Sequence, residues 1–411
     1  MLFAFAFKNM WRRKVRTFLT CGSVGLALWA AVLFVGLREH AYETLVNLSA
    51  KAGYGHLTIA AKGFLDNLGG SVPLVEFDND VLYQAVKGMC RVLPRVFADG
   101  SVQSSGRTQA AYFWGVDPDK ESTGTNVYFE SVTEGEAPYL AEKSSCMVGQ
   151  LLLNRLRLQL GDEVIYTIAN QAGQLSSYSC VARSSFVTGN TGIDAHTVVL
   201  PRVVLATNIG GGQGQASFYA LYTNKDFSIN ELASSLSKIM AGSHLEAFHW
   251  RHTQPGLWGY ILRDSLMFRM TLVLGFVIIG AGMFSTMIIA ILERKKEIGT
   301  MLAMGMLPRE LVLSFFIESF YITTLGVLMG SLILLPFIWY FTEVGLDVGR
   351  IFDLRMNIGG VFVNDMVLFI RMNLTNNVVI VAMLYVLTAL ATVYPARKAL
   401  NTDPIKMIRG D

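Results

Sequence analysis

The sequence predicts a membrane α-helical protein with four transmembrane helices and a large α+β extracytoplasmic domain. Apolar residues make up 52 % of the 411 residues and the mean hydropathy is +0.42, which is too apolar for a soluble protein of this size. Four stretches are long enough, and free enough of charge, to cross a bilayer. They are Phe18–Leu37, Leu266–Leu292, Leu311–Tyr340 and Val378–Tyr394. The block between the first two stretches reads as one soluble unit.

Basic residues set the expected orientation. They cluster before the first span, between the second and third, and after the fourth, so these three segments are expected in the cytoplasm. Residues 38–264 carry 17 Lys and Arg against 21 Asp and Glu, and an acidic block between basic flanks belongs outside. The net charge of +3 therefore reflects topology and is no nucleic-acid signal. An uncleaved first span is favoured over a signal peptide, because its apolar run is about twenty residues long and no small-residue cleavage site follows.

In chain order, the pattern predicts nine segments. The first is an amphipathic cytoplasmic helix at 1–17, with Phe7, Met10 and Trp11 as interfacial anchors. The others are the first span at 18–37, the external domain at 38–264, the second span at 265–292, a cytoplasmic segment at 293–310, the third span at 311–340, a short external loop at 341–377, the fourth span at 378–394 and a cytoplasmic tail at 395–411. Helical patterning from Glu39 to Lys51 indicates that the first span projects outward as a stalk.

The external domain alternates short strands and helices. Its first and last thirds look alike, so residues of about 119–200 read as a nested insertion in an α+β unit. Strands are predicted at Leu57–Ala60, Tyr112–Gly115, Glu163–Ala169, Phe218–Thr223 and Leu245–Trp250, and helices at Asp80–Met89, Val148–Leu160, Arg202–Thr207 (with Pro201 in the first turn) and Asn230–Met240. Three cysteines, Cys90, Cys146 and Cys180, fall in this domain; one disulfide can form among them, and the sequence does not say which pair.

The segment after the second span carries the strongest functional signal. The run Glu293-Arg294-Lys295-Lys296-Glu297 is charged, and the residues after it are amphipathic. Ile298, Met301, Leu302 and Met304 fall near one face at helical spacing. Two interpretations remain open: a short helix that docks a cytoplasmic partner, or a basic cluster that only fixes topology.

Motifs for nucleotide binding or catalysis do not occur in the sequence. There is no P-loop, no G-x-S-x-G and no H-E-x-x-H. The glycines at 210–214 fail the Rossmann spacing and read as a loop, and His249-x-x-His252 has no carboxylate or cysteine to complete a metal site. Glu318 lies inside the third span; it is either part of a proton or substrate relay or an acid hydrogen-bonded to a neighbouring helix. We assign no catalytic residue, no metal ligand and no cofactor to this chain.

Three segments resemble motifs of one transporter family. Glu293-Arg294-Lys295-Lys296-Glu297-Ile298-Gly299 to Ala303-Met304-Gly305 is similar to a coupling-helix signature, Tyr394-Pro395-Ala396-Arg397-Lys398-Ala399 with Asp403-Pro404-Ile405 is similar to a C-terminal motif, and Gly149-Gln150 to Gly161-Asp162 is similar to a periplasmic core. With the one-large-loop topology, the chain thus resembles the MacB/FtsX superfamily (type VII) of ABC transporter permeases. Chain length and Phe248-His249-Trp250-Arg251 resemble the lipoprotein-releasing branch of the LolC/LolE type. The run Asn9 to Thr20 is more similar to the exporters, and the loop at 342–377 departs from the usual pattern.

The resemblance implies a transport subunit rather than an enzyme. A separate cytoplasmic ATPase dimer would bind ATP and Mg²⁺, and a second permease copy or a sister permease would complete the complex in the bacterial inner membrane, with both termini cytoplasmic. The expected function is lipoprotein release from that membrane to a periplasmic acceptor; the alternatives are a MacB-like exporter of macrolides, peptides or other amphiphiles and an FtsX-like interaction or signalling protein. The implied coupling residues are Glu293, Arg294, Lys296, Glu297, Ile298, Gly299, Met301, Leu302, Met304 and Gly305. The implied lipid or substrate cavity comprises Leu26, Trp29, Phe34, Met267, Met270 and Leu274.

Overall fold

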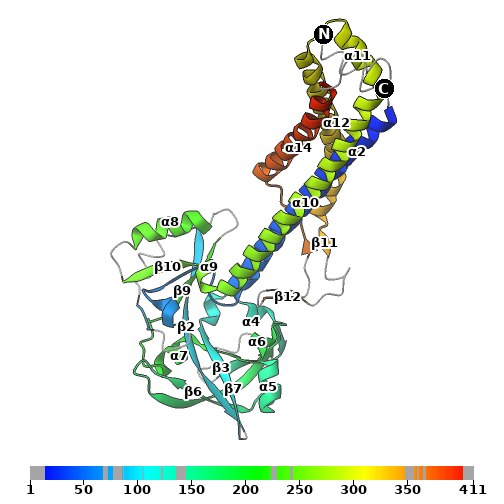
Figure 1. Cartoon of the computed structure of the whole chain (residues 1–411). Coiled ribbons are helices and arrows are strands. Elements are labelled where there is room, and N and C mark those ends of the chain that lie inside the picture. The colour runs from blue at the N-terminus through cyan, green and yellow to red at the C-terminus, as the bar shows by residue number, and fades with distance from the viewer. Residues whose placement is uncertain are drawn as a thin grey trace. The chain divides into compact units, whose positions relative to one another are not determined.

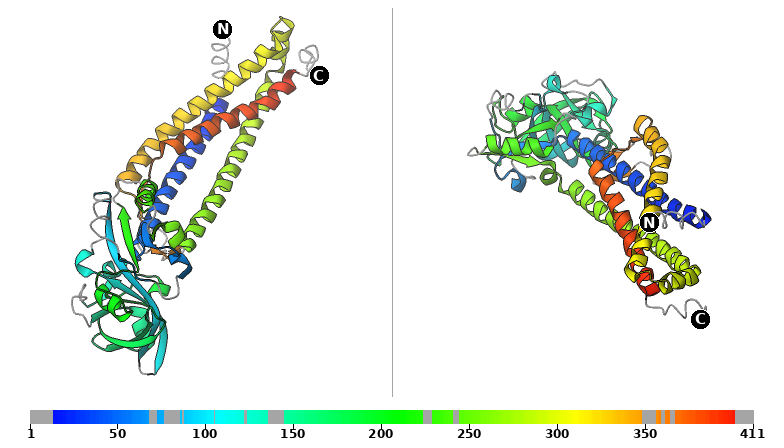
Figure 2. Two further views of the ribbon diagram at one scale, coloured as in Figure 1. Left: turned by 90° about the vertical axis from the view of Figure 1, so that its left-hand side faces the viewer. Right: turned by 90° about the horizontal axis from the view of Figure 1, so that it is seen from above.

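The chain folds into two units, which Figures 1 and 2 show as a helical bundle and a sheet-rich domain. The membrane unit comprises Met1–Ala41, Arg263–Ile351 and Val367–Asp411, and the sheet unit comprises Tyr42–Leu262 and Phe352–Met366. The computed structural model describes residues 14–67, 73–76, 86, 88–104, 106–121, 124–135, 145–223, 229–240, 244–347, 356–358, 361–363 and 367–400. The anchors predicted at Phe7, Met10 and Trp11, almost all of the helix predicted at 80–89, and the tail at 401–411 lie outside these residues.

Four long helices form the membrane unit and run side by side in both views of Figure 2. Each contains one of the predicted spans, and each is long and apolar enough to cross a membrane. They are α2 (Lys14–Lys51), α10 (Pro255–Glu293), α12 (Pro308–Glu343) and α14 (Leu374–Leu400). The last helix continues through Pro395, so the first residues of the expected tail are helical. The predicted fold class, four transmembrane helices joined to a large α+β domain, is confirmed.

Close backbone contact joins α2 to α12. A Cβ atom built on Gly330 would lie 2.5 Å from the carbonyl oxygen of Gly25, and one on Gly326 would lie 2.8 Å from that of Cys21. The Gly326-x-x-x-Gly330 spacing therefore serves helix packing here. Around this crossing, apolar side chains of all four helices form one core, including Val24, Leu28, Phe276, Met283, Leu334 and Leu384.

A short helix and two short strand pairs lie between the last three long helices in the sequence. A short helix, α11 (Lys295–Ala303), lies between α10 and α12 at the end of the bundle opposite β11 (Figure 1). Two short antiparallel pairs occur between α12 and α14: β11 (Leu346–Asp347) with β14 (Val367–Leu368), and β12 (Met356–Ile358) with β13 (Val361–Val363).

The described strands between Tyr42 and Leu262 form one ten-stranded sheet. Its order is β10-β1-β9-β2-β3-β8-β5-β7-β4, with β6 paired to β2 and β7. The strands are β1 (Leu57–Ala61), β2 (Cys90–Ser104), β3 (Arg107–Val116), β4 (Val132–Glu134), β5 (Ser145–Gly149), β6 (Glu163–Ala169), β7 (Leu175–Phe186), β8 (Thr197–Pro201), β9 (Phe218–Thr223) and β10 (Leu245–His249). The helices are η1 (Phe64–Asn67), η2 (Pro118–Lys120), α4 (Val127–Glu130), α5 (Gln150–Leu156), α6 (Thr191–Asp194), α7 (Arg202–Asn208), α8 (Ile229–Ile239) and α9 (Trp250–Thr253).

The long strand β2 joins the two halves of this sheet. Its first residues, Cys90–Arg95, pair with β9, and its later residues pair with β3 and β6. One half holds β1, β9, β10 and α8, which come from the two ends of the unit's sequence. The other half holds β3 to β8 with α5 and α7 packed on it. Residues 119–200, expected as an insertion, supply β4 to β8 of this second half.

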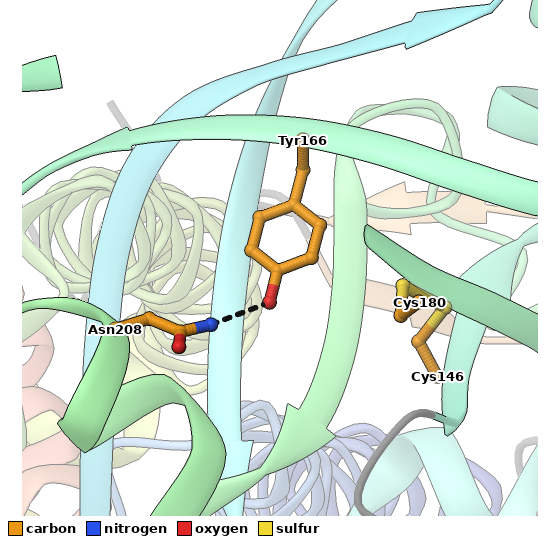
Figure 3. The surroundings of a disulfide bond; sticks show 4 residues. All are labelled: Cys146, Tyr166, Cys180 and Asn208. Atoms are coloured by element: carbon orange, nitrogen blue, oxygen red, sulfur yellow. Dashed lines mark hydrogen bonds between the residues drawn. A yellow bond between two sulfur atoms is a disulfide. The ribbon is translucent and has the colours of Figure 1, made fainter. Parts of the chain in front are cut away.

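A disulfide connects neighbouring strands of the second half. Cys146 of β5 is bonded to Cys180 of β7, and both residues are buried (Figure 3). The same figure shows Tyr166 of β6, whose hydroxyl accepts a hydrogen bond of 2.8 Å from the side-chain amide of Asn208 at the end of α7. Cys90 remains a free thiol, so the single pair that the sequence left open is Cys146 with Cys180.

One predicted element of the sheet unit is wrong in part. Val148–Leu160 was expected to be helical throughout, but Val148 and Gly149 belong to β5 and the helix α5 ends at Leu156. Arg157 adopts a left-handed conformation with φ 56° and closes the helix. Further along the chain, Pro201 ends β8 and caps α7 instead of standing inside its first turn.

Candidate functional site

The candidate site is the joint at which α10 gives way to α11. The helix α10 ends at Glu293, and Arg294 has φ −102° and ψ 14°, outside the helical region. The backbone N–H of Arg294 donates to the carbonyl of Ile291, and its own carbonyl accepts from Ile298. The chain therefore turns within one residue from a membrane-spanning helix into a separate short helix.

The far end of α11 is closed by a Schellman motif. Gly305 has φ +96°, the conformation that glycine adopts without strain. Its N–H donates to Leu302, and the N–H of Met306 donates to Met301. These two bonds satisfy carbonyl groups that the helix end would otherwise leave open. The predicted role of Gly305 in the signature thus has a local cause: a residue with a side chain would strain this stop.

The two faces of α11 differ in burial. Ile298 and Gly299 are buried, and Met301 and Leu302 pack against an apolar cluster. This cluster comprises Ile291, Leu311, Phe315 and Ala396 of α10, α12 and α14. Met304 was expected on the same face, but it caps the helix and is 81 % exposed, so that expectation is wrong. On the opposite face, Lys296, Glu297 and Thr300 are exposed.

Arg294, although it belongs to the predicted coupling signature, turns inward. Its guanidinium lies 3.2 Å from a carboxylate oxygen of Glu318 on α12. Both side chains are largely buried, with exposed fractions of 11 % and 6 %. Of the two interpretations of Glu318, an acid bonded to a neighbouring segment therefore fits this geometry, because the carboxylate has an arginine partner.

Hydroxyl groups continue this polar contact toward α14, and the sequence analysis missed them. Ser319 and Thr392 are 2.6 Å apart, and Thr323 donates to Thr388 at 3.0 Å. All four are buried. The sequence does contain a signal for these contacts: Ser319 and Thr323 are one helical turn apart, and so are Thr388 and Thr392. Two such pairs at matching spacing in two spans indicate facing helices.

The six residues of the predicted lipid cavity do not form a closed site. Leu26, Phe34, Met267, Met270 and Leu274 are exposed on α2 and α10. Trp29 instead turns into the bundle, where it packs edge-on against Phe337 of α12 with ring centroids 5.2 Å apart. An exposed apolar side chain is the ordinary state of a helix in lipid, so these five residues form a surface rather than a closed site. A separate apolar cavity of about 550 Å³ lies between Phe18 of α2 and Met329 of α12.

Of the two histidines weighed as metal ligands, His249 has a structural role at the start of α9. His249 caps α9 by accepting a hydrogen bond from the N–H of Arg251 at 3.3 Å. Burial, with smaller contributions from Arg251, His252 and His56, lowers the pKa of His249 to about 4. Within the described residues, no group of three or more His, Cys, Asp or Glu side chains is arranged to hold a metal ion.

The chain is similar in sequence to known permeases. Residues 269–404 match the family described as "FtsX-like permease C-terminal". The chain is 23 % identical over 340 residues to "Macrolide export ATP-binding/permease protein MacB" of Psychrobacter cryohalolentis, and equally to that of Psychrobacter arcticus. Each match covers 77 % of this chain and 48 % of the relative, so the chain spans about half the length of the curated relatives it matches. The C-terminal membrane part of the chain thus matches the FtsX-like permease family, and the chain as a whole is similar to MacB proteins.

Two solved structures are also similar. The first is the periplasmic region of MacB from Actinobacillus actinomycetemcomitans, with a TM-score of 0.35 and 13 % identity, covering 48 % of this chain and 90 % of that one. The second is the extracellular domain of the transporter YknZ from Gram-positive bacteria, with a TM-score of 0.33 and 13 % identity, covering 47 % and 99 %.

Proposed function

We propose that this chain is the permease subunit of an ABC transporter and that α11 is the helix gripped by a separate cytoplasmic ATPase dimer. The observation that carries the proposal is the geometry of α11. Its buried face is fixed to three membrane helices through Ile298, while its other face presents Lys296, Glu297 and Thr300. A helix held in this way passes a push on its outer face to the bundle instead of swinging freely. ATP and Mg²⁺ would bind to the ATPase, which supplies the energy of the cycle.

We place α11 in the cytoplasm and the sheet unit outside a bacterial inner membrane. The basic flanks of the spans and the acidic balance of residues 38–264 favour this multi-pass orientation, with both termini cytoplasmic. The buried Cys146–Cys180 disulfide supports it, because disulfides persist in oxidising compartments outside the cytoplasm.

Single cysteines test this orientation. In a Cys90→Ser background, a cysteine at Leu175 should react with an impermeant thiol reagent in cells whose outer barrier is removed, and one at Met304 should not. Both positions are highly exposed, so accessibility of the side chain itself does not decide the outcome. Labelling of Met304 but not of Leu175 in intact cells would place α11 out of reach of any ATPase.

The mechanism we propose moves the sheet unit without opening a channel. Two helices, α2 and α10, extend without interruption past the residues at which the two units divide. Closure of the ATPase on α11 would tilt these helices and so act on the sheet unit. Inside the bundle, Glu318 is paired with Arg294, and the hydroxyls of Ser319 and Thr323 contact those of Thr392 and Thr388. This pairing favours force transmission over a polar path for substrate.

The cargo we propose is a lipid-modified protein that is released from the membrane to a periplasmic acceptor, with a second permease copy or a sister permease completing the complex. The exposed apolar surface of α2 and α10, including Met267 and Met270, suits acyl chains. Moving an acyl chain from this surface toward water costs about 0.8 kcal/mol per CH₂, which is the work that ATP would supply.

Two other functions remain as candidates. Export of macrolides, peptides or other amphiphiles is favoured by the similarity to MacB over 77 % of the chain. An interaction or signalling role is the third, supported by the FtsX-like match over residues 269–404. Copurification from mild detergent followed by intact-mass analysis separates the three: an ATPase with a lipoprotein, an ATPase with a small amphiphile, or a partner that transports nothing.

A charge reversal tests the docking helix. Glu297→Lys should uncouple ATP hydrolysis from transport while the protein still inserts, because reversing a charge in a contact costs a few kcal/mol. The matched control is Glu343→Lys, the same change on an exposed residue at the other end of α12. Wild-type transport by an assembled Glu297→Lys complex would show that α11 does not transmit force.

Photocrosslinking tests the cargo. A photoreactive residue at Met267 should capture a lipoprotein, whereas the same residue at the exposed Val386 of α14 should capture membrane lipid. Met267→Asp should block loading, since a charge near the membrane costs several kcal/mol against an acyl chain. Capture of a small amphiphile at Met267, with no lipoprotein, would favour the exporter.

A further inference from the structure

We propose that Glu318 is a positioning residue that holds the α10–α11 joint against α12, so that force on α11 moves α12 and α14 together. This inference rests on the proposed docking of an ATPase at α11. Glu318 thereby takes part in coupling, and Arg294 holds the joint from inside instead of contacting the partner.

The backbone determines how α11 follows α10, but it does not fix the joint against α12. Arg294 stands alone between the last residue of α10 and the first of α11, and no side-chain hydrogen bond caps α11 at this residue. The backbone hydrogen bonds of Arg294, to Ile291 and from Ile298, stay within α10 and α11, so side-chain contacts must hold the joint against α12. Apolar packing of Ile298 supplies one contact and the ion pair with Glu318 supplies the other.

The ion pair is suited to this task because it is directional and buried. Its atoms lie 3.2 Å apart, and water reaches little of either side chain. Removing one partner of a buried pair leaves an uncompensated charge, which is strongly unfavourable, whereas an apolar contact loosens gradually. The pair therefore favours one arrangement of the joint over neighbouring ones.

Glu318 also stands where α12 and α14 are joined by hydroxyl groups. The next residue, Ser319, contacts Thr392, and one turn further Thr323 donates to Thr388. A cavity of about 20 Å³ borders Glu318, Ser319, Thr388 and Thr392; it has room for one water molecule and for no transported substrate. The cluster is thus built to join helices, and a push received at the joint reaches α14 through it.

A charge swap tests the pair. In the assembled transporter, Glu318→Gln and Arg294→Gln should each lower the ratio of substrate moved to ATP hydrolysed by at least about fivefold, the lower end of typical coupling between sites. The double variant Arg294→Glu/Glu318→Arg should return the ratio to within about twofold of wild type, because it restores the pair. Thr324→Val is the matched control: it removes a 3.0 Å contact between α12 and Tyr385 of α14 without touching the joint, and should leave the ratio unchanged.

A second measurement needs no ATPase. Spin labels at Thr300 of α11 and Leu313 of α12, both exposed, report the joint directly in the full chain in lipid nanodiscs carrying Cys90→Ser. The distance distribution should be narrow in the otherwise unchanged chain and in the swap, and broader in either single variant. If a single variant does not fold, the swap still decides, since a folded swap with a narrow distribution supports the pair.

The outcomes separate this inference from the proposed function. A wild-type ratio together with a narrow distribution in Glu318→Gln would overturn the role of Glu318 while leaving the permease function standing. A wild-type complex that moves no substrate on ATP hydrolysis would overturn the proposed function, and the spin labels would then still decide whether the pair sets the joint. If the double variant is as defective as the single variants, each residue matters at its own position and their pairing does not. That result would also overturn the inference.

Discussion

The sheet unit and the membrane unit each bury an arginine–glutamate pair, and the two pairs are built differently. In the sheet unit, Arg95 of β2 meets Glu121, with exposed fractions of only 1 % and 2 %. Arg95 also donates to the hydroxyl of Tyr222, and Glu121 accepts from Thr125 at 2.8 Å. Arg95 lies on β2 at the point where the pairing of this strand passes from β9 to β3, so the backbone around Arg95 is already fixed.

The pair in the membrane unit has a different setting. Arg294 stands at a joint between α10 and α11, and Glu318 lies on the continuous helix α12, against which no backbone hydrogen bond of Arg294 holds the joint. The same two side-chain types thus specify a rigid core in one unit and the position of a joint in the other. The surrounding backbone decides which of these roles a buried pair has, and the following variants break or sharpen the contrast.

The largest effect is expected at Arg95. Arg95→Met should destabilise the sheet unit by about 3–5 kcal/mol, because Glu121 is left as a buried charge without its main partner. Thermal unfolding of the purified chain in detergent, followed by circular dichroism in the strand region, measures the loss. The double variant Arg95→Met/Glu121→Leu should recover much of it, since an apolar pair of similar volume fits the same site. Equal loss in the single and double variants would argue that packing of Arg95, and not its charge, matters.

The disulfide should have the next largest effect. Replacing both Cys146 and Cys180 by alanine should cost about 3–4 kcal/mol, as expected from chain entropy for a bond that closes a sequence separation of 34 residues. Reductant should lower the unfolding midpoint of the wild-type chain and leave the double alanine variant unchanged. Cys90→Ala serves as the control, because Cys90 is not bonded. A chain isolated from cells with both thiols free to react would contradict the oxidising location of the sheet unit.

The contrast also shows which features the sequence could predict. The four spans follow from length and charge alone, because lipid requires a long uncharged stretch whatever it packs against. Strands with clear boundaries, such as Glu163–Ala169 and Phe218–Thr223, are found where they were predicted. Val148 was misread as helical, since a buried strand between β7 and β8 is apolar on both faces and shows no alternation.

The joint could be predicted only in part. The charged run and the glycine stop of α11 are local signals, and both are found in place. The inward turn of Arg294 depends on a partner 24 residues away in another span, and no local pattern contains that information. Met304 comes two residues after Leu302, which is about 200° around a helix, so the helical period itself places Met304 away from the face of Ile298 and Leu302.

The membrane unit relies on close helix packing where the sheet unit relies on bonded side chains, and Gly330 tests this difference. Gly330→Leu should cost about 1–3 kcal/mol, because the new side chain meets the backbone of Gly25, which cannot move aside without separating α2 from α12. Gly22→Leu is the control, since a Cβ at Gly22 meets nothing within 4 Å. The unfolding midpoint in detergent measures both. If the two variants behave alike, the close crossing does not hold the bundle together.

The smallest effect is expected at an ion pair of the sheet unit that is not buried. Lys51, at the end of α2, lies 2.9 Å from Glu130 of α4, with exposed fractions of 22 % and 29 %. Lys51→Met should change the free energy of unfolding by less than about 1 kcal/mol, because water already reaches both charges in the wild-type chain and still solvates Glu130 after the change. The residual difference from wild type should shrink in 1 M salt, where the Debye length is about 3 Å. Lys51→Met removes a cation just as Arg95→Met does, so a loss as large as that at Arg95 would show that burial does not decide what an ion pair contributes in this unit.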